Sequence, residues 1–332
     1  MARALVLGAT GHIGAHIVRA LLNEGHEVRA AYRTERFLHV LQGLPVERIH
    51  VDLDTLNGLG EALDGCDWIF HAGAYYPASG ERRDAAAARG VETTRRVLDR
   101  IRKAKPARLI FTSSSSTIRH VTGRLANEQD AEPWPISESR SRYAAVKIAI
   151  EREVERFFQE GLPVVMTNPS VCFGEYDARP FSGRAILAIA RYRLPCYVEK
   201  SFDAIYTGDV GIGHVRAAER GRLGERYLLT CRRISVREFA GIIAKAIGVR
   251  PPCVRVPYGA VLAAATISEW IAAIAGREPL LPRQVIQAGR EGEGLDGTKA
   301  LRELGLPQTP IDEAIQRALS WFKEHRYLYR YL

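Results

Sequence analysis

Cysteine is scarce and scattered in this 332-residue sequence, which has five cysteines and no Cys-x-x-Cys pair. An odd, irregularly spaced set supports neither a disulfide framework nor a zinc knuckle. This usage is typical of a reducing compartment, so we expect a cytoplasmic protein. His12 and His16 are four positions apart but have no third ligand near them in the sequence, so we expect no metal site.

Long hydrophobic runs are also absent. The most apolar stretch, residues 258–275, is interrupted by Ser268 and Glu269 and is shorter than the ~20 residues that a membrane span requires. We expect an amphipathic helix that lines a pocket there. No signal-like segment precedes the first strand pattern, so we expect no stable membrane insertion.

Acidic residues are in the minority, with 38 Asp and Glu against 47 Lys and Arg, and the net charge is +9. A basic balance can indicate a nucleic-acid partner, but here the basic residues are spread along the whole chain. We therefore expect no nucleic-acid partner. The pattern favours a solvated surface and a small-molecule substrate or cofactor that carries negative charge.

The first half of the chain alternates short apolar runs with helical patterns. This alternation predicts an α/β fold with a doubly wound parallel sheet of the Rossmann type. The predicted strands are residues 4–7, 27–32, 46–51, 67–71, 108–111 and 162–166. Beyond residue 170 the alternation loosens, which predicts a smaller mixed α/β substrate region. We assign residues 1–170 to a dinucleotide-binding domain, with a returning segment at about 203–232, and residues 171–202 and 233–332 to the substrate-binding region.

A glycine-rich loop follows the first predicted strand, and a helical pattern follows the loop. Glycines allow the backbone to approach a pyrophosphate closely, and the N-terminus of the helix offers free N–H groups to it. The alternative is a plain tight turn, but the order strand, loop, helix favours a dinucleotide site. The candidate residues are Gly8, Thr10, Gly11, His12, Ile13 and Gly14.

The second predicted strand ends without the acidic residue that usually binds a free ribose 2′-hydroxyl. Arg33 stands there instead, and a guanidinium group suits a 2′-phosphate. We therefore expect a preference for NADP(H), with NAD(H) possible; an exposed arginine without a ligand is the alternative. Asp52, which Leu53 follows, ends the third strand. It either accepts from the adenine amino group or caps a helix that begins near Thr55.

Small and hydroxyl-bearing residues follow the next two strands. Ala72, Gly73 and Ala74 follow the fourth, and Thr112–Ser116 follow the fifth. The carboxyl ends of parallel strands meet at one edge of the sheet, where ligands bind. Small residues leave room for a cofactor, and hydroxyls can hold a substrate oxygen. Serine clusters also simply form turns, but this position favours a function for at least one serine. Residues 115–138 form a long polar connection, typical of an active-site loop.

Of the 13 tyrosines, only Tyr143 has a lysine, Lys147, four positions later. The pair lies in a helical pattern over residues 139–160, and side chains four apart share one face of a helix. A nearby ammonium group favours the phenolate and lowers the pKa of a phenol. Such a pair can transfer a proton to or from a substrate oxygen near pH 7. An ordinary helix surface is the alternative.

Together these segments resemble the extended short-chain dehydrogenases/reductases. The resemblance covers essentially the whole chain. The segments that carry it are the Gly8–Gly14 loop, Asp52–Leu53, Thr112–Ser114, Tyr143-x-x-x-Lys147 and Asn168–Gly174.

The resemblance assigns roles to individual residues. It implies that Tyr143 is the acid/base, and that Lys147 holds the nicotinamide ribose and lowers the Tyr143 pKa. Ser114 would orient the reacting oxygen, with Ser115 as the weaker candidate. The stretch from Pro169 to Val171 would receive the nicotinamide amide.

Within that family the sequence is similar to the dihydroflavonol-4-reductase-like branch, which includes bacterial proteins named hopanoid-associated sugar epimerases. Gly90 stands where the family usually has an asparagine. Ser113 and Ser114 replace the Asp-Glu pair of sugar dehydratases, which disfavours dehydration. Thr167–Ser170 is similar to the reductases rather than to nucleotide-sugar epimerases.

Three functions are therefore considered. The first is an NADP(H)-dependent reductase of a mid-sized, fairly apolar carbonyl compound. The second is a sugar or nucleotide-sugar epimerase with a retained cofactor, and the third is a non-catalytic dinucleotide-binding protein. Tyr75, Tyr76 and Phe173 are candidates for the substrate pocket, with ordinary packing as the alternative. The resemblance also implies a homodimer formed through the helices at residues 82–103 and 139–160.

Overall fold

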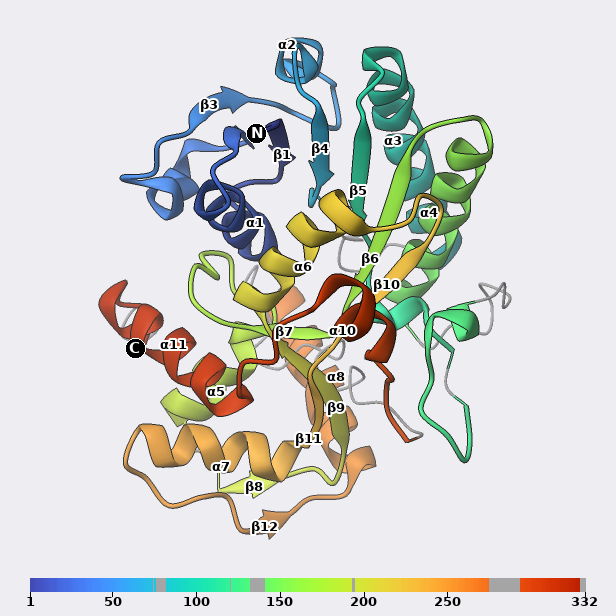
Figure 1. Cartoon of the computed structure of the whole chain (residues 1–332). Coiled ribbons are helices and arrows are strands. Elements are labelled where there is room, and N and C mark those ends of the chain that lie inside the picture. Colours follow the sequence, from blue (N-terminus) through green and yellow to red (C-terminus); the bar gives the residue numbers. More distant parts are fainter. Residues whose placement is uncertain are drawn as a thin grey trace.

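The computed structural model describes residues 1–73, 75, 82–119, 121–131, 141–192, 195–274 and 293–328. Within these residues the central feature is a parallel seven-stranded sheet in the order β3-β2-β1-β4-β5-β6-β10 (Figure 1). The strand order reverses between β1 and β4, which confirms the predicted doubly wound fold. The strands are β1 (Arg3–Leu7), β2 (Glu27–Tyr32), β3 (Glu47–His50), β4 (Trp68–His71), β5 (Arg108–Thr112), β6 (Val164–Pro169) and β10 (Arg226–Leu229).

The first strand shows why both faces of this sheet are covered. Successive side chains of a strand point to opposite faces, so Ala4 and Val6 enter one apolar core while Leu5 and Leu7 enter the other. The first core lies against α1 (His12–Asn23) and α6 (Thr207–Arg220), and the second lies against α3 (Arg83–Ala104) and α4 (Arg142–Gln159). The short helix α2 (Leu59–Leu63) joins the second core.

A smaller part of the molecule lies below the main sheet in Figure 1. Its three-stranded sheet has the order β11-β9-β7, and a second sheet pairs β12 with β8. The strands are β7 (Val171–Phe173), β8 (Cys196–Tyr197), β9 (Ser201–Tyr206), β11 (Arg232–Ser235) and β12 (Val254–Arg255). The helices of this part are α5 (Gly183–Tyr192), α7 (Val236–Ala246), α8 (Tyr258–Ile274) and α11 (Ile311–Glu324).

The returning segment is divided between the two parts. β9 belongs to the small sheet, whereas α6 packs on α1 and β10 extends the main sheet. The late helix α10 (Thr298–Leu304) contacts α6 and β10, so it lies against the main sheet rather than in the smaller part. The helix expected near Thr55 begins only at Leu59. The expected long loop contains two short 3₁₀ helices, η2 (Ser115–Thr117) and η3 (Glu128–Ala131). Another 3₁₀ helix, η1 (Glu35–Leu41), follows β2.

The described part of the apolar stretch forms the helix α8 (Tyr258–Ile274), but it does not present a simple amphipathic pattern. In α8 the side chains of Ile267, Trp270, Ile271 and Ile274 are exposed, Trp270 by 72%. Exposed apolar side chains can face a pocket as well as solvent, so the predicted pocket-lining role of this helix stays a prediction. No helix in the described ranges combines the length and apolarity needed to cross a membrane.

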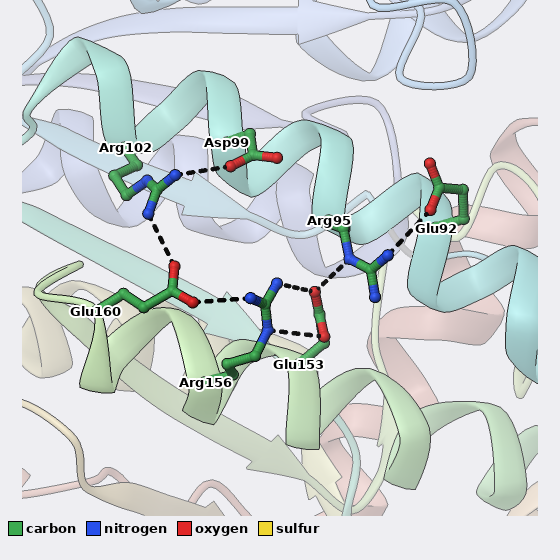
Figure 2. Close-up of polar contacts among 7 residues, drawn as sticks. All are labelled: Glu92, Arg95, Asp99, Arg102, Glu153, Arg156 and Glu160. Atoms are coloured by element: carbon green, nitrogen blue, oxygen red, sulfur yellow. Dashed lines mark hydrogen bonds and ion pairs between the residues drawn. The ribbon is translucent and has the colours of Figure 1, made fainter.

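An ion-pair network joins α3 and α4 on their outer side (Figure 2). Arg95 donates to Glu153, which also accepts from Arg156, and Arg102 donates to Glu160 on the other helix. Exposed ion pairs contribute about 0.2–1 kcal/mol each. The network therefore supports the alignment of α4, whose N-terminal end carries Tyr143, without dominating its stability.

Candidate active site

The glycine loop between β1 and α1 has no room for larger side chains. Gly8 has φ +83°, and a Cβ atom there would lie 2.8 Å from Gly73 N. A Cβ atom at Gly14 would lie 2.1 Å from Gly8 O. α1 begins directly after this loop, and no side chain caps its N-terminus at Gly11. The backbone thus forms a cradle at a helix N-terminus, which fits the pyrophosphate of a dinucleotide.

The side chain of His12, at the start of α1, makes its contacts outside this cradle. His12 Nε2 lies 2.9 Å from Thr207 Oγ1, and His12 Nδ1 lies 4.0 Å from Asp177 Oδ2. Burial lowers the pKa of His12, and Asp177 opposes the effect. The side chain therefore joins the glycine loop to α6, so only the backbone of His12 can serve a phosphate group.

The helix that carries Tyr143 starts at a side-chain cap. Ser141 Oγ accepts a hydrogen bond from Ala144 N at 3.1 Å, which satisfies one of the free N–H groups of the first turn. Lys147 Nζ lies 5.9 Å from the centroid of the Tyr143 ring. The structure thus brings the two predicted residues together on one face of α4.

Lys147 is almost fully buried, with 2% exposure, and its Nζ donates to Thr112 O at 3.3 Å. Burial lowers the pKa of Lys147 to about 8, against the attraction of Glu151. Burial, together with Lys147, lowers the pKa of His71 at the end of β4 to about 4. At pH 7 the lysine is therefore mostly a cation beside the phenol, while the histidine is neutral.

The serine run starts at the strand end that Lys147 contacts. Ser114 follows β5 and caps η2, with its Oγ accepting from Ser116 N at 3.2 Å. Ser115, the first residue of η2, is buried. Within the described residues, the hydroxyls of Ser113 and Ser170 are buried without a hydrogen-bond partner. These two orphaned hydroxyls follow the neighbouring strands β5 and β6, which fits a polar ligand such as the nicotinamide amide at this edge.

Comparison with known proteins identifies the family. A sequence profile of the NAD dependent epimerase/dehydratase family matches residues 4–229. The chain belongs to this family. It is thus an NAD(P)-dependent enzyme of the extended short-chain dehydrogenase/reductase type, as the motifs predicted.

Three similar proteins span nearly the whole chain. A putative dihydroflavonol 4-reductase from Synechocystis sp. is 32% identical and covers 97% of this chain and 95% of its own length. A 4-hydroxy-2-methyl-3-oxo-4-farnesyl-3,4-dihydroquinoline-1-oxide ketoreductase from Stigmatella aurantiaca is 31% identical, with 91% of each chain covered. The structure of a nucleoside-diphosphate-sugar epimerase from Pseudomonas aeruginosa is 27% identical, has a TM-score of 0.78, and covers 98% of this chain and 99% of its own.

Arg33, the residue predicted to hold a ribose 2′-phosphate, lies at the end of β2. Its side chain is 59% exposed and pairs with Asp54 at 3.5 Å. Asp52 Oδ1 accepts from the backbone N of Asp54 at 2.8 Å, so it caps the turn after β3 and not a helix, since α2 begins only at Leu59 after Gly58. Its predicted contact with the adenine amino group stays a prediction. Leu53 packs against Gly73, because a Cβ atom added to Gly73 would lie 2.7 Å from Leu53 Cδ1.

The predicted pocket residues are placed less favourably. Phe173 is buried, with its ring 4.9 Å from Phe239 and 6.0 Å from Phe202, which favours the packing alternative. Tyr75 is partly buried against the second core. Ala72 N donates to Leu7 O and continues the sheet. Two further predicted residues, Ala74 and Tyr76, lie outside the described residues.

Gly90 occupies the position at which the resemblance predicts an asparagine. A Cβ atom there would lie 3.0 Å from Val146 Cγ1 and 3.2 Å from both Ile150 Cδ1 and Tyr75 Cδ1. A longer side chain therefore does not fit between α3 and α4 without moving its neighbours. The departure from the family pattern is accommodated by tight packing of Tyr75 and α4 against Gly90.

Two residues near the site were missed by sequence reasoning. The Phe181 ring, in the segment before α5, lies 6.5 Å from the Tyr143 ring and is 48% exposed. No motif surrounds Phe181, so the sequence held no signal for it. Glu151 is buried one helical turn beyond Lys147, and its four-residue spacing from Lys147 was a signal that could have been used.

Proposed function

We propose that this protein is an NADP(H)-dependent reductase that converts a carbonyl group of a mid-sized, fairly apolar substrate to an alcohol, or catalyses the reverse oxidation. The observation that carries the proposal is the position of Lys147. Its buried ammonium group shares a helix face with Tyr143 and binds the end of the strand that leads to Ser114. One cation thus serves both the proton donor and the loop that carries the candidate hydroxyl.

The chemistry is divided between cofactor and side chains. A bound nicotinamide cofactor supplies or accepts the hydride. Tyr143 donates its phenolic proton to the oxygen on which negative charge develops, and the Lys147 ammonium stabilises the phenolate that remains. The Ser114 hydroxyl donates a hydrogen bond to the same oxygen, which stabilises the developing charge.

An apolar substrate is supported by the surroundings of Tyr143. Phe181 presents an exposed aromatic ring beside the proposed acid, and such rings commonly line sites for apolar ligands. The relative from Stigmatella aurantiaca is named for a farnesyl-bearing ketone. Phe181 comes from residues 171–202, which supports our proposal that this stretch, with residues 233–332, forms the substrate-binding region.

The proposed preference for NADP(H) is supported by Arg33. Its guanidinium group is exposed at the carboxyl end of β2, and Asp54 holds it there at 3.5 Å. A guanidinium in this place can make charge-assisted hydrogen bonds to a ribose 2′-phosphate. Fluorescence titration of the purified chain with NADPH and NADH tests this directly, and equal affinities would contradict it.

The reductase proposal is tested by steady-state NADPH oxidation with a panel of aromatic and prenylated ketones. Tyr143→Phe should lower kcat on the best ketone by about 100-fold or more, while the Kd for NADPH changes little. Tyr227→Phe is the matched control, because Tyr227 also lies beside a lysine, with Lys299 Nζ 4.6 Å from its ring, but in β10 outside the proposed substrate-binding region. A Tyr143→Phe variant with the wild-type rate would refute the proposal. NADPH binding without turnover of any ketone would instead favour a non-catalytic dinucleotide-binding protein.

A sugar or nucleotide-sugar epimerase is the second candidate, favoured by the similarity to the Pseudomonas aeruginosa epimerase structure. The same tyrosine and lysine would act, but the cofactor would stay bound between turnovers. Absorbance of the purified protein distinguishes the two. A bound nicotinamide spectrum, together with no net NADPH consumption on any ketone, would favour the epimerase.

We also propose that the protein is a cytoplasmic homodimer that pairs through α3 and α4. The outer side of this helix pair carries alternating arginines and carboxylates, which a symmetric copy can meet with opposite charges (Figure 2). Sedimentation velocity tests the proposal. The double variant Arg102→Glu, Arg156→Glu should sediment as a monomer, and an unchanged dimer would exclude this interface.

A further inference from the structure

A buried carboxylate lies one helical turn beyond Lys147. Glu151, in α4, is 3% exposed, and its carboxylate accepts hydrogen bonds from three other elements. Oε1 accepts from Asn168 Nδ2 at 2.7 Å and from Thr117 Oγ1 at 3.0 Å. Oε2 accepts from Arg226 Nη1 at 2.8 Å. Residues at the ends of β6 and in η2 and β10 thus converge on one side chain of α4.

Two of these donors also hold the backbone of Ser114. Asn168 Nδ2 lies 3.1 Å from Ser114 O, and Thr117 Oγ1 lies 2.9 Å from the same oxygen. The Asn168 amide has two hydrogens, so it can bind Glu151 and Ser114 at once. Thr117 has a single hydrogen and donates to one of the two. Asn168 Nδ2 also lies 3.0 Å from Thr117 Oγ1, so the two donors contact each other as well as Glu151 and the Ser114 carbonyl.

The cluster links the two halves of the proposed triad. Tyr143, Lys147 and Glu151 follow at four-residue spacing, so they lie along one side of α4. Ser114 belongs to the loop after β5 and has no covalent connection to α4 nearby. Because Asn168 and Thr117 contact both Glu151 and the Ser114 carbonyl, displacing the carboxylate would release the serine from the helix.

The Glu151 carboxylate is paired with a cation. A buried carboxylate requires such a partner, because an unpaired buried charge is strongly unfavourable. Arg226 supplies this cation, and its second nitrogen pairs with Glu155. Glu151 in turn raises the pKa of Lys147 against the effect of burial. The carboxylate therefore bears on both the geometry of the serine loop and the charge of the lysine.

We infer that Glu151 is a positioning residue of the active site, which fixes Ser114 relative to Tyr143 and Lys147. The inference rests on the proposed function, because it presumes that these three residues act together. Glu151 itself touches neither the substrate nor the cofactor in this scheme. It acts through Asn168 and Thr117 on the serine and through space on the lysine.

The test compares Glu151→Gln with Glu155→Gln. Both lie on α4 and pair with Arg226, and both substitutions remove one charge with almost no change in volume, but Glu155 does not contact Asn168 or Thr117. In Glu151→Gln we expect kcat on the best ketone to fall about 10- to 100-fold, because small misplacements of catalytic groups cost this much. The Kd for NADPH, measured by fluorescence, should change less than about threefold. Glu155→Gln should match the wild type.

The pH profile separates a positioning role from a merely structural one. The groups that face Lys147 are Glu151 and Tyr143 on α4, His71 on β4 and the Thr112 carbonyl of β5. Without the carboxylate the ammonium loses its proton at a lower pH. The alkaline limb of kcat/KM should therefore move to lower pH in Glu151→Gln and stay in place in Glu155→Gln.

Two further measurements keep the inference open to refutation. Amide hydrogen exchange in peptides covering residues 112–119 should speed up in Glu151→Gln but not in Glu155→Gln, a readout that needs no substrate.

If Glu151→Gln does not fold, Thr117→Val and Thr117→Ser replace it: the valine variant should lose activity and the serine variant should retain it. Wild-type kcat, pH profile and exchange in a folded Glu151→Gln would overturn the inference. If Tyr143→Phe is also unimpaired, it is the proposed function that fails; if only Glu151→Gln is unimpaired, the positioning role alone fails.

Discussion

Protonation of a buried histidine should limit the stability of this protein in acid. His214 lies in α6, and its side chain is fully buried between this helix and the main sheet. Its Nδ1 lies 2.7 Å from Val210 O, and because a carbonyl only accepts, Nδ1 carries the proton. Its Nε2 lies 2.9 Å from both Thr112 Oγ1 and Thr167 Oγ1 and therefore accepts a hydroxyl hydrogen. A second proton on Nε2 would force these hydroxyls to accept instead of donate and would bury a charge.

The size of the effect follows from the pKa. Burial lowers the pKa of His214 from 6.5 to about 4, against the opposing hydrogen bond to Val210. A histidine whose pKa is lower in the folded state is protonated first in the unfolded chain. Stability is therefore lost as the pH falls from about 6.5 toward 4, and by pH 4.5 the loss amounts to about 2.5 kcal/mol for this one group.

The assay is urea unfolding of wild type and His214→Gln between pH 7.5 and 4.5, followed by tryptophan fluorescence. Glutamine keeps a donor and an acceptor but does not titrate. His214→Gln should be less stable than the wild type at pH 7.5, and the gap should shrink by about 2.5 kcal/mol by pH 4.5. His39→Gln, at an exposed position, should run parallel to the wild type. If the gap for His214→Gln is the same at every pH, the reasoning is wrong.

Three shorter predictions address the cofactor and substrate sites. Gly14→Ala should abolish NADPH binding in a fluorescence titration, because its Cβ atom would lie 2.1 Å from Gly8 O. Gly60→Ala should bind normally, because a Cβ atom there has nothing within 4 Å. Normal binding by Gly14→Ala would contradict the proposed pyrophosphate cradle. Arg33→Ser should weaken NADPH binding roughly 10-fold or more and leave NADH binding unchanged, as expected for the loss of a charge-assisted hydrogen bond; an equal loss for both cofactors would argue against 2′-phosphate recognition. Phe181→Ala should raise KM for apolar ketones several-fold with a smaller effect on kcat, and Phe181→Leu should recover part of the loss; an unchanged KM would place the substrate elsewhere.

Several elements were predicted closely because their signals are local. β2 has the predicted bounds Glu27–Tyr32, and β1 and β5 each differ by one residue. The start of α1 followed from the glycine loop. The helix after Asp52 was placed too early, because Asp52 caps a turn through Asp54 N, and the first helical residue is Leu59. A side chain that can cap either a turn or a helix does not by itself indicate which one follows.

The sequence alone determined the doubly wound order, the glycine cradle and the pairing of Tyr143 with Lys147. These depend on backbone rules and on spacing within one helix, which adjacent residues specify. Only the tertiary structure decided that Phe173 packs in the core, that Phe181 lies beside Tyr143, and that Glu151 joins α4 to the Ser114 loop through Asn168. Those contacts join segments far apart in the chain, and which side chains meet across them depends on how the strands and helices pack in three dimensions.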